Sequence, residues 1–149
     1  MDQEGFQALD KDKARRSFSR AAPDYDGAAV LQHEMGRRML ERLDYIRLEP
    51  RVILDIGCGT GVATEGLMRR YPGAQVLALD FALPMLERTR KRGRWLRRPR
   101  CLCADLDYLP LADQSVDLIF ANASLQWSTH PAQAFVDIAR VLRPGGLLM

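Results

Sequence analysis

The stretch Arg51-Val52-Ile53-Leu54-Asp55-Ile56-Gly57-Cys58-Gly59-Thr60-Gly61 decides the fold of this chain. An apolar, β-branched run ends in three glycines at alternate positions, and a helical pattern follows. This order predicts a buried strand, a tight turn and a helix N-terminus. Because glycine has no Cβ and adopts positive φ angles, such a turn lets the backbone approach a ligand closely. The stretch therefore predicts a nucleotide-binding turn.

The spacing of these glycines argues against a dinucleotide fold. Val62 stands where the third glycine of the G-x-G-x-x-G pattern would be, and a bulky residue there disfavours a pyrophosphate on the helix start. A second apolar run, at residues 75–80, ends in Asp80, 19 residues past Gly61. A carboxylate at the end of that strand can accept both ribose hydroxyls of an adenosine moiety. A generic α/β turn with an incidental aspartate is the plain alternative.

With these two features the chain resembles class I S-adenosylmethionine-dependent methyltransferases, whose first motif is an acidic residue followed by G-x-G-x-G. The resemblance implies that S-adenosylmethionine is the cofactor and S-adenosylhomocysteine the product. It also implies that Asp55 anchors the glycine loop and the methionine amino group. Methyl transfer asks little of side chains, because positioning of the acceptor and exclusion of water provide most of the acceleration.

Other cofactor contacts are expected at the ends of the predicted strands. Phe81 and Met85 are placed to pack on the adenine, although Met85 fits an ordinary core position equally well. The resemblance implies that Asp105 accepts from the adenine N6 amine, that the Leu106 N–H meets the ring edge, and that Asn122 lies near the sulfonium. A cap or turn role is the alternative for Asn122. The expected cofactor-binding residues are Asp55, Gly57, Gly59, Gly61, Asp80, Phe81, Met85, Asp105, Leu106 and Asn122.

The order of the elements predicts an α/β fold with a doubly wound, mostly parallel, Rossmann-like sheet. Besides the first strand, we expect helices at 14–22, 26–46, 62–71 and 132–142, one helix opening near Pro84, and strands at 75–80, 100–104 and 116–121. Residues 1–48 are expected to form an N-terminal helical lid, and residues 49–149 an S-adenosylmethionine-binding domain.

The end of the sequence suggests that this domain is incomplete. A turn at residues 143–146 leads into Leu147-Leu148-Met149, where a fifth strand would just have begun. On the seven-stranded methyltransferase plan, the C-terminal strands and any substrate-binding insert would be missing. We then expect the fourth strand to be left as an exposed edge.

Composition fits a cytoplasmic protein without a metal site. Of the 149 residues, 47% are hydrophobic and 28% charged, as in ordinary soluble proteins. No apolar run reaches the ~20 residues that a membrane span needs, and the acidic start of the chain does not resemble a secretory signal. Three cysteines and two isolated histidines show no metal-ligand spacing.

Two further segments resemble one particular family within the class I methyltransferases. Phe18-Ser19-Arg20-Ala21-Ala22-Pro23-Asp24-Tyr25-Asp26 and Asn122-Ala123-Ser124-Leu125-Gln126-Trp127 are similar to the malonyl-acyl-carrier-protein O-methyltransferase family of biotin synthesis. That family esterifies the free carboxylate of a malonyl thioester, which is ionised at pH 7 and needs no base. The resemblance implies that Tyr25 belongs to a lid over the cofactor and that Gln126 and Trp127 line the acceptor pocket. No residue is assigned a catalytic role, and the acceptor-side candidates are Tyr25, Asn122, Gln126 and Trp127; a solvent-side Tyr25 and a core Trp127 are the alternatives.

A basic stretch could meet the acidic acyl-carrier protein that carries the malonyl thioester. Eight Lys and Arg residues lie between Arg88 and Arg100 with no acid among them. Its only aromatic residue is Trp95, which argues against nucleic acid as the partner. The plain alternative is that these residues form the solvated end of a helix. The stretch should also lie on the adenine side of the cofactor site, away from the methyl acceptor, which is an objection to a carrier contact there.

Two other functions share the cofactor motifs. Related methyltransferases act at carbon on quinone precursors, and an apolar acceptor pocket would favour them. A similar fold also serves, without catalysis, as an assembly factor for a respiratory complex.

Overall fold

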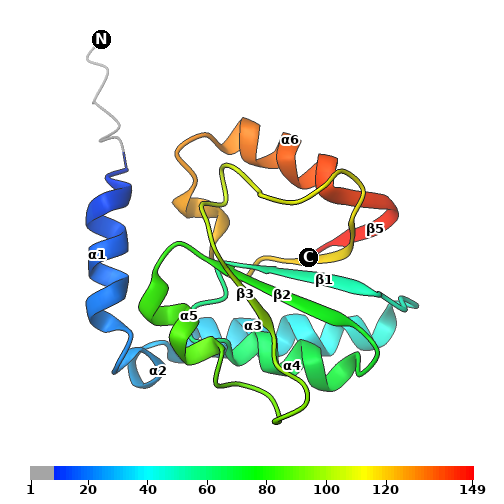
Figure 1. Ribbon diagram of the computed structural model, residues 1–149, viewed down its shortest axis with the longest axis horizontal. Helices are drawn as coiled ribbons and strands as arrows, with labels where there is room; N and C mark the ends of the chain where they lie inside the picture. Colours follow the sequence, from blue (N-terminus) through cyan, green and yellow to red (C-terminus); the bar gives the residue numbers. More distant parts are fainter. Residues whose placement is uncertain (1–8) are drawn as a thin grey trace.

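The computed structural model describes residues 9–149, which form a five-stranded sheet with helices on both faces (Figure 1). The strands are β1 (Val52–Ile56), β2 (Gln75–Asp80), β3 (Arg100–Cys103), β4 (Val116–Phe120) and β5 (Leu142–Leu148). Their order is β3-β2-β1-β4-β5, and each neighbouring pair is parallel. The predicted doubly wound, parallel α/β fold is therefore confirmed.

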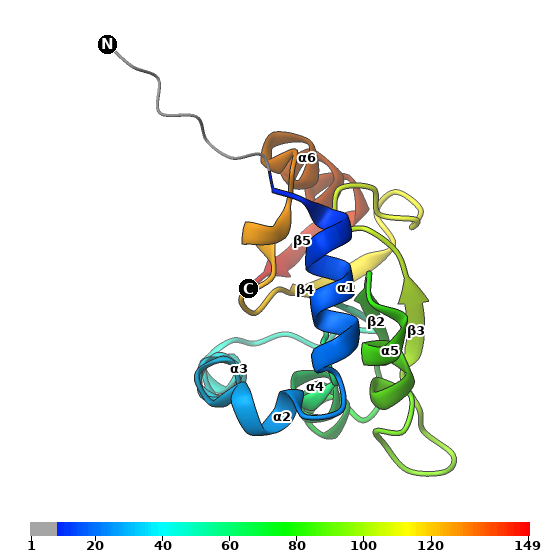
Figure 2. The ribbon, with the colours of Figure 1, turned by 90° about the vertical axis from the view of Figure 1, so that its left-hand side faces the viewer.

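The helices cover the two faces and one end of the sheet. They are α1 (Lys11–Ala21), α2 (Tyr25–Ala28), α3 (Val30–Arg42), α4 (Val62–Arg70), α5 (Leu83–Thr89) and α6 (Pro131–Val141), with short 3-10 turns at η1 (Leu43–Tyr45) and η2 (Leu125–Trp127). In Figure 1, α6 lies on one side of the sheet and α3 and α4 on the other. Figure 2 shows α1 standing across one end of the sheet, next to α5. Within residues 9–149, no helix combines the length and apolar character needed to cross a bilayer.

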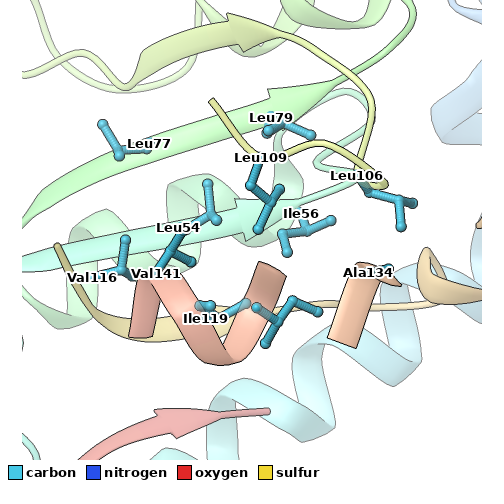
Figure 3. Close-up of a cluster of buried hydrophobic side chains, with 11 residues drawn as sticks. Leu54, Ile56, Leu77, Leu79, Leu106, Leu109, Val116, Ile119, Ala134 and Val141 are labelled. Carbon is cyan, nitrogen blue, oxygen red and sulfur yellow. The ribbon is translucent and has the colours of Figure 1, made fainter. Parts of the chain in front are cut away.

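Two hydrophobic cores hold the sheet between its helices. Side chains alternate between the faces of a strand, so Leu54 and Ile56 of β1 point to the α6 side and Ile53 to the α4 side. On the α6 side they pack with Ile138, in the cluster drawn in Figure 3. On the α4 side Ile53 packs with Leu67. Burial on both faces explains why β1, β2 and β4 read as nearly continuous apolar runs.

The long helix expected at 26–46 is divided into three pieces. Ala29 has φ −89° and ψ 35°, which ends α2 before α3 begins, and the residue is only 2% exposed. Gly27 lowers the helix propensity of the first piece. The inward face of α3 is carried by Met39 and Leu40, so Val30 is 70% exposed although it fits the apolar period.

The expectation that the fourth strand would be an edge is wrong. β5 begins at Leu142, immediately after α6, and pairs with β4 on both sides of an irregularity: Val116 with Leu142, then Leu118 with Leu147 and Ile119 with Leu148. The turn expected at 143–146 is an irregularity inside β5, where Gly145 takes a φ of 79°. The edges of the sheet are therefore β3 and β5.

Candidate cofactor-binding site

A cavity of about 350 Å³ lies where the carboxyl ends of the central strands meet α1. It is lined by Lys11, Phe18, Tyr25, Gln32, His33, Asp55, Gly57, Cys58, Gly59, Thr60, Val62, Ala63, Leu79, Asp80, Phe81, Met85, Ala104, Asp105, Leu106, Asn122, Ala123, Ser124, Gln126 and Trp127. The fold thus brings together nearly all of the residues that the sequence singled out. Of the predicted site residues, Gly61 alone does not line the cavity. All of these residues lie within the described part of the chain.

The glycine turn needs its glycines for different reasons. Gly57, Gly59 and Gly61 all have positive φ angles, of 67°, 55° and 84°. A Cβ at Gly57 would lie 2.4 Å from Cβ of Ser124, and one at Gly61 would lie 2.8 Å from the Thr89 side chain. A Cβ at Gly59 would meet only Cε1 of Tyr25, at 3.8 Å. Packing against the protein therefore excludes side chains at Gly57 and Gly61, whereas Gly59 borders open cavity space.

Asp80 ties the glycine turn to the end of β2. Its carboxylate accepts hydrogen bonds from the Gly59 N–H at 3.0 Å and from the Ala82 N–H at 2.9 Å. The residue is 6% exposed, and this burial raises the pKa of its carboxyl group, while the backbone donors oppose the rise. The remaining lone pairs of the carboxylate can accept from a ligand in the cavity.

Asp55 is a buried acid at the floor of the cavity. It accepts a hydrogen bond from Thr64 Oγ1 at 2.6 Å. Burial raises the pKa of Asp55 to about 7; the Thr64 hydrogen bond lowers it and the nearby Asp80 charge raises it further. The structure gives Asp55 no cationic partner among residues 9–149. A cationic ligand group in the cavity would favour the ionised carboxylate.

Aromatic side chains connect α1 to the cavity wall. The Phe18 ring packs edge-on against Trp127, with 5.2 Å between centroids and an interplanar angle of 88°. It also lies 5.9 Å from the Phe81 ring and 6.3 Å from the Tyr25 ring. Burial and the negative charge of Asp80 raise the pKa of the Tyr25 hydroxyl, so it stays protonated. Site roles were predicted from the sequence for Tyr25, Phe81 and Trp127. Phe18 entered only as part of a family-like segment, and the structure brings its ring against theirs.

A second set of contacts, which the sequence did not indicate, fixes the start of α1. Lys11 donates to both carboxylate oxygens of Asp105, at 2.6 and 2.7 Å, and to Asp107. Asp107, whose side chain is 1% exposed, also accepts from the Ser128 hydroxyl and from the Thr129 N–H at 3.1 Å. Burial alone would raise the pKa of Asp107, but these donors hold it well below its usual range. This network joins α1 to the segment after Gln126 and Trp127.

Two buried oxygens of the cavity wall have no hydrogen-bond partner within the described part of the chain. Nδ2 of Asn122 donates to the Gln32 carbonyl at 2.7 Å, but Oδ1 of Asn122 has no partner among residues 9–149. The same holds for Oγ of Ser124, a residue that is 4% exposed. Buried polar atoms almost always have a hydrogen-bond partner, so this wall fits a polar ligand. In the same part of the chain no group of three His, Cys, Asp or Glu residues could hold a metal ion.

Comparisons with known proteins identify the family of this chain. Residues 54–149 match the family described as "Methyltransferase domain", and the chain belongs to this family. It is 50% identical over 143 residues to a malonyl-acyl-carrier-protein O-methyltransferase of Halorhodospira halophila, covering 96% of this chain and 48% of that protein. A protein of the same name from Xylella fastidiosa is 52% identical, covering 91% of this chain and 46% of its own length. The chain thus spans about half the length of the curated relatives that it matches.

Solved structures show the same fold. The putative methyltransferase in a complex with the Haloferax volcanii Trm112 activator superposes with a TM-score of 0.76 at 26% sequence identity. The match covers 88% of this chain and 57% of that protein's chain. A putative S-adenosyl-L-methionine-dependent methyltransferase of Methanococcus maripaludis superposes with a TM-score of 0.77 at 23% sequence identity. The match covers 99% of this chain and 66% of that protein's chain. The Rossmann-like methyltransferase fold expected from the glycine stretch is confirmed.

Proposed function

We propose that this chain binds S-adenosylmethionine in the cavity beneath α1 and belongs to an enzyme that methylates the free carboxylate of malonyl-acyl-carrier protein in biotin synthesis. The observation that carries the proposal is the 50% identity, over 96% of the chain, to a relative named for that reaction. The cavity supports it, because its volume of about 350 Å³ is in the range of small-molecule sites and its walls combine apolar and polar groups.

The chain offers a suitable partner for each part of the cofactor. Asp80 would accept from the ribose hydroxyls, and Asp55 would face the methionine ammonium. Phe81 and Met85 would pack on the adenine, and Asp105 would accept from its N6 amine. Gly57, Gly59 and Gly61 would shape the turn, and the Leu106 N–H would meet the ring edge. The unpartnered oxygens of Asn122 and Ser124 supply further acceptor capacity.

The bound cofactor would supply a methyl group already activated on a sulfonium, so the protein must position the acceptor and exclude water. The malonyl carboxylate is ionised at neutral pH and needs no general base. Tyr25, Gln126 and Trp127 would border the acceptor, with Asn122 beside the reacting centre. The Phe18 ring would close this side of the cavity by its contact with Trp127.

The proposal also covers the domains of the chain, its partner and its location in the cell. Residues 1–48 would act as the lid and residues 49–149 as the cofactor-binding domain; the first eight residues of that lid lie outside the described part. The acyl-carrier protein would be the partner and the cytoplasm the location.

Calorimetric titration of the purified chain with S-adenosylhomocysteine, with NAD as the control ligand, tests the cofactor site. We expect binding of S-adenosylhomocysteine alone. Binding of NAD alone would contradict the interpretation of the glycine turn, since Val62 disfavours a pyrophosphate there.

The reaction is tested with two carrier proteins. The chain and S-adenosylmethionine are incubated with malonyl-acyl-carrier protein or with acetyl-acyl-carrier protein, which lacks the free carboxylate. Intact-mass measurement should show one added methyl group on the malonyl form only. Methylation of both forms would place the methyl group elsewhere on the carrier and would contradict the proposed acceptor.

A further inference from the structure

A second hollow lies between α1 and the start of α5, on the outer side of Phe81. This groove, of about 630 Å³, is lined by Arg15, Arg16, Ser19, Arg20, Phe81, Leu83, Pro84 and Cys103. Figure 2 shows the two helices side by side. Phe81 lines both this groove and the cofactor cavity, so the two hollows share a wall.

Within residues 9–149, the rim of the groove carries positive charge that no acidic side chain neutralises. Arg16 and Arg20 are four residues apart on α1, which places them on one face of the helix, and both are exposed. In the described part of the chain neither forms an ion pair, whereas Arg15 is partly neutralised by Asp12 at 2.9 Å. The guanidinium groups of Arg16 and Arg20 are thus available to an acidic partner.

The basic stretch at 88–100 is more occupied by its own protein. Arg88 donates to the Pro23 carbonyl at 2.7 Å, and Arg97 donates to the Met68 carbonyl at 3.2 Å. Arg92 lies 3.0 Å from Asp26, with which it forms an ion pair. Part of the charge in this stretch therefore serves to hold the fold, which favours the groove as the binding surface.

The floor of the groove is apolar. Leu83 is 52% exposed, and Pro84 and Phe81 are partly exposed beside it. A surface with an apolar floor and a basic rim matches an amphipathic helix whose polar face is acidic. A free phosphate would use the arginines and leave the apolar floor uncovered.

We propose that the groove between α1 and α5 is the docking surface for an acidic helix of the acyl-carrier protein. This inference rests on the proposed function, which supplies an acidic carrier as the partner. The carrier's acidic side chains pair with Arg16 and Arg20, and its apolar side chains cover Leu83 and Pro84. Helix α1 then serves two purposes, because Phe18 faces the cofactor cavity and Arg16 faces the partner.

Charge reversal at two matched pairs of arginines tests the docking surface. Arg16→Glu/Arg20→Glu changes the groove, and Arg94→Glu/Arg98→Glu makes the same change of charge in the other basic stretch. The dissociation constant for acyl-carrier protein is measured with both the malonyl form and the form without a prosthetic group. We expect the first variant to bind the carrier roughly tenfold more weakly and the second to bind within about twofold of the native chain.

Two further readouts separate docking from folding. Affinity for S-adenosylhomocysteine should be unchanged in both variants, because neither pair lines the cofactor cavity. Added salt should weaken carrier binding by the native chain more than by the Arg16→Glu/Arg20→Glu variant, since the exposed charges are screened.

The outcomes also separate this inference from the proposed function. Methylation of malonyl-acyl-carrier protein with a KM that is insensitive to Arg16→Glu/Arg20→Glu would overturn the docking surface and leave the reaction standing. Carrier binding that depends on Arg16 and Arg20 without any methyl transfer would support the docking surface and contradict the reaction. Loss of binding only in Arg94→Glu/Arg98→Glu, or no carrier binding at all, would overturn the docking surface.

Discussion

The ammonium group of Lys11 lies 2.6 Å from Oδ1 of Asp105 and also donates to the buried carboxylate of Asp107. Lys11 is the first residue of α1, and both acids follow β3. One side chain therefore fastens the N-terminal helix to the end of the sheet, beside the cavity. The contact matters for closure of the cavity, because Phe18 on the same helix forms part of its wall.

Replacing Lys11 by Met removes this charge and keeps an apolar stem. We expect the free energy of unfolding to fall by about 1–3 kcal/mol, because Asp107 is left buried without its cationic partner. Urea denaturation measures this change, and limited trypsin digestion at Arg16 and Arg20 should become faster as α1 is released. Lys13→Met, at an exposed position of the same helix, should change stability by less than about 0.5 kcal/mol. Equal effects of the two substitutions would show that the Lys11 contacts do not hold α1.

Replacing Asp80 by Asn tests the link between the glycine turn and ligand binding. The amide nitrogen would face the N–H of Gly59 or of Ala82, so one donor loses its acceptor. We expect a loss of about 1–3 kcal/mol in stability and of roughly tenfold to hundredfold in affinity for S-adenosylhomocysteine, measured by melting and by calorimetry. Asp113→Asn is the control, because that side chain is 76% exposed and pairs with Arg140 outside the cavity. Unchanged affinity in Asp80→Asn would remove Asp80 from the proposed ribose site.

The raised pKa of Asp55 makes the stability of the free chain depend on pH. Burial raises this pKa from 3.8 to about 7, so between these values the folded protein keeps a proton that the unfolded chain has lost. The unfolded state then binds fewer protons, and the contribution of Asp55 to stability falls as pH rises from about 4 to about 7. Above pH 7 both states are ionised and the contribution becomes constant.

Asp55→Asn removes this titration and keeps an acceptor for Thr64. Urea midpoints of the native and variant chains are compared at steps between pH 4.5 and pH 8.5. We expect the native chain to lose stability relative to the variant up to about pH 7 and to keep a constant difference above it. A difference that is the same at every pH would mean that Asp55 is already ionised at low pH in the folded protein.

The sequence predicted those parts of the molecule in which neighbouring residues determine the structure. The apolar run before Gly57 and the one before Asp80 were assigned to the correct strands, because strand burial and turn chemistry are local. The break at Ala29 was missed, because the apolar period continues across it and Val30 fits that period while remaining exposed.

Contacts between distant parts of the chain could not be predicted in this way. Lys11 and Asp105 are 94 residues apart, and nothing near either residue indicates the pairing. Asp107 is likewise one of many acids in the sequence, and only the fold brings Ser128 and Lys11 to it. The residues expected to touch the cofactor were proposed from motifs, whereas the contacts that hold α1 against the end of the sheet required the structure.

The glycine turn allows a ligand role to be separated from a packing role. In Gly57→Ala the new Cβ would lie 2.4 Å from Cβ of Ser124, so we expect a lower melting temperature. In Gly59→Ala the Cβ would enter the space beside Tyr25, at 3.8 Å, with only the strain of a φ of 55°. That strain costs about 1–2 kcal/mol, and the methyl group enters space assigned to the proposed ligand.

Gly59→Ala should therefore keep a cooperative melt and lose at least about tenfold in affinity for S-adenosylhomocysteine, because the methyl group adds bulk to the cavity wall without a clash inside the protein. Gly73→Ala is the control, since a Cβ there meets nothing within 4 Å. Melting and calorimetry are measured on all three variants. If Gly59→Ala bound S-adenosylhomocysteine as tightly as Gly73→Ala, the ligand would not pass beside the turn, and the proposed position of the cofactor would be wrong.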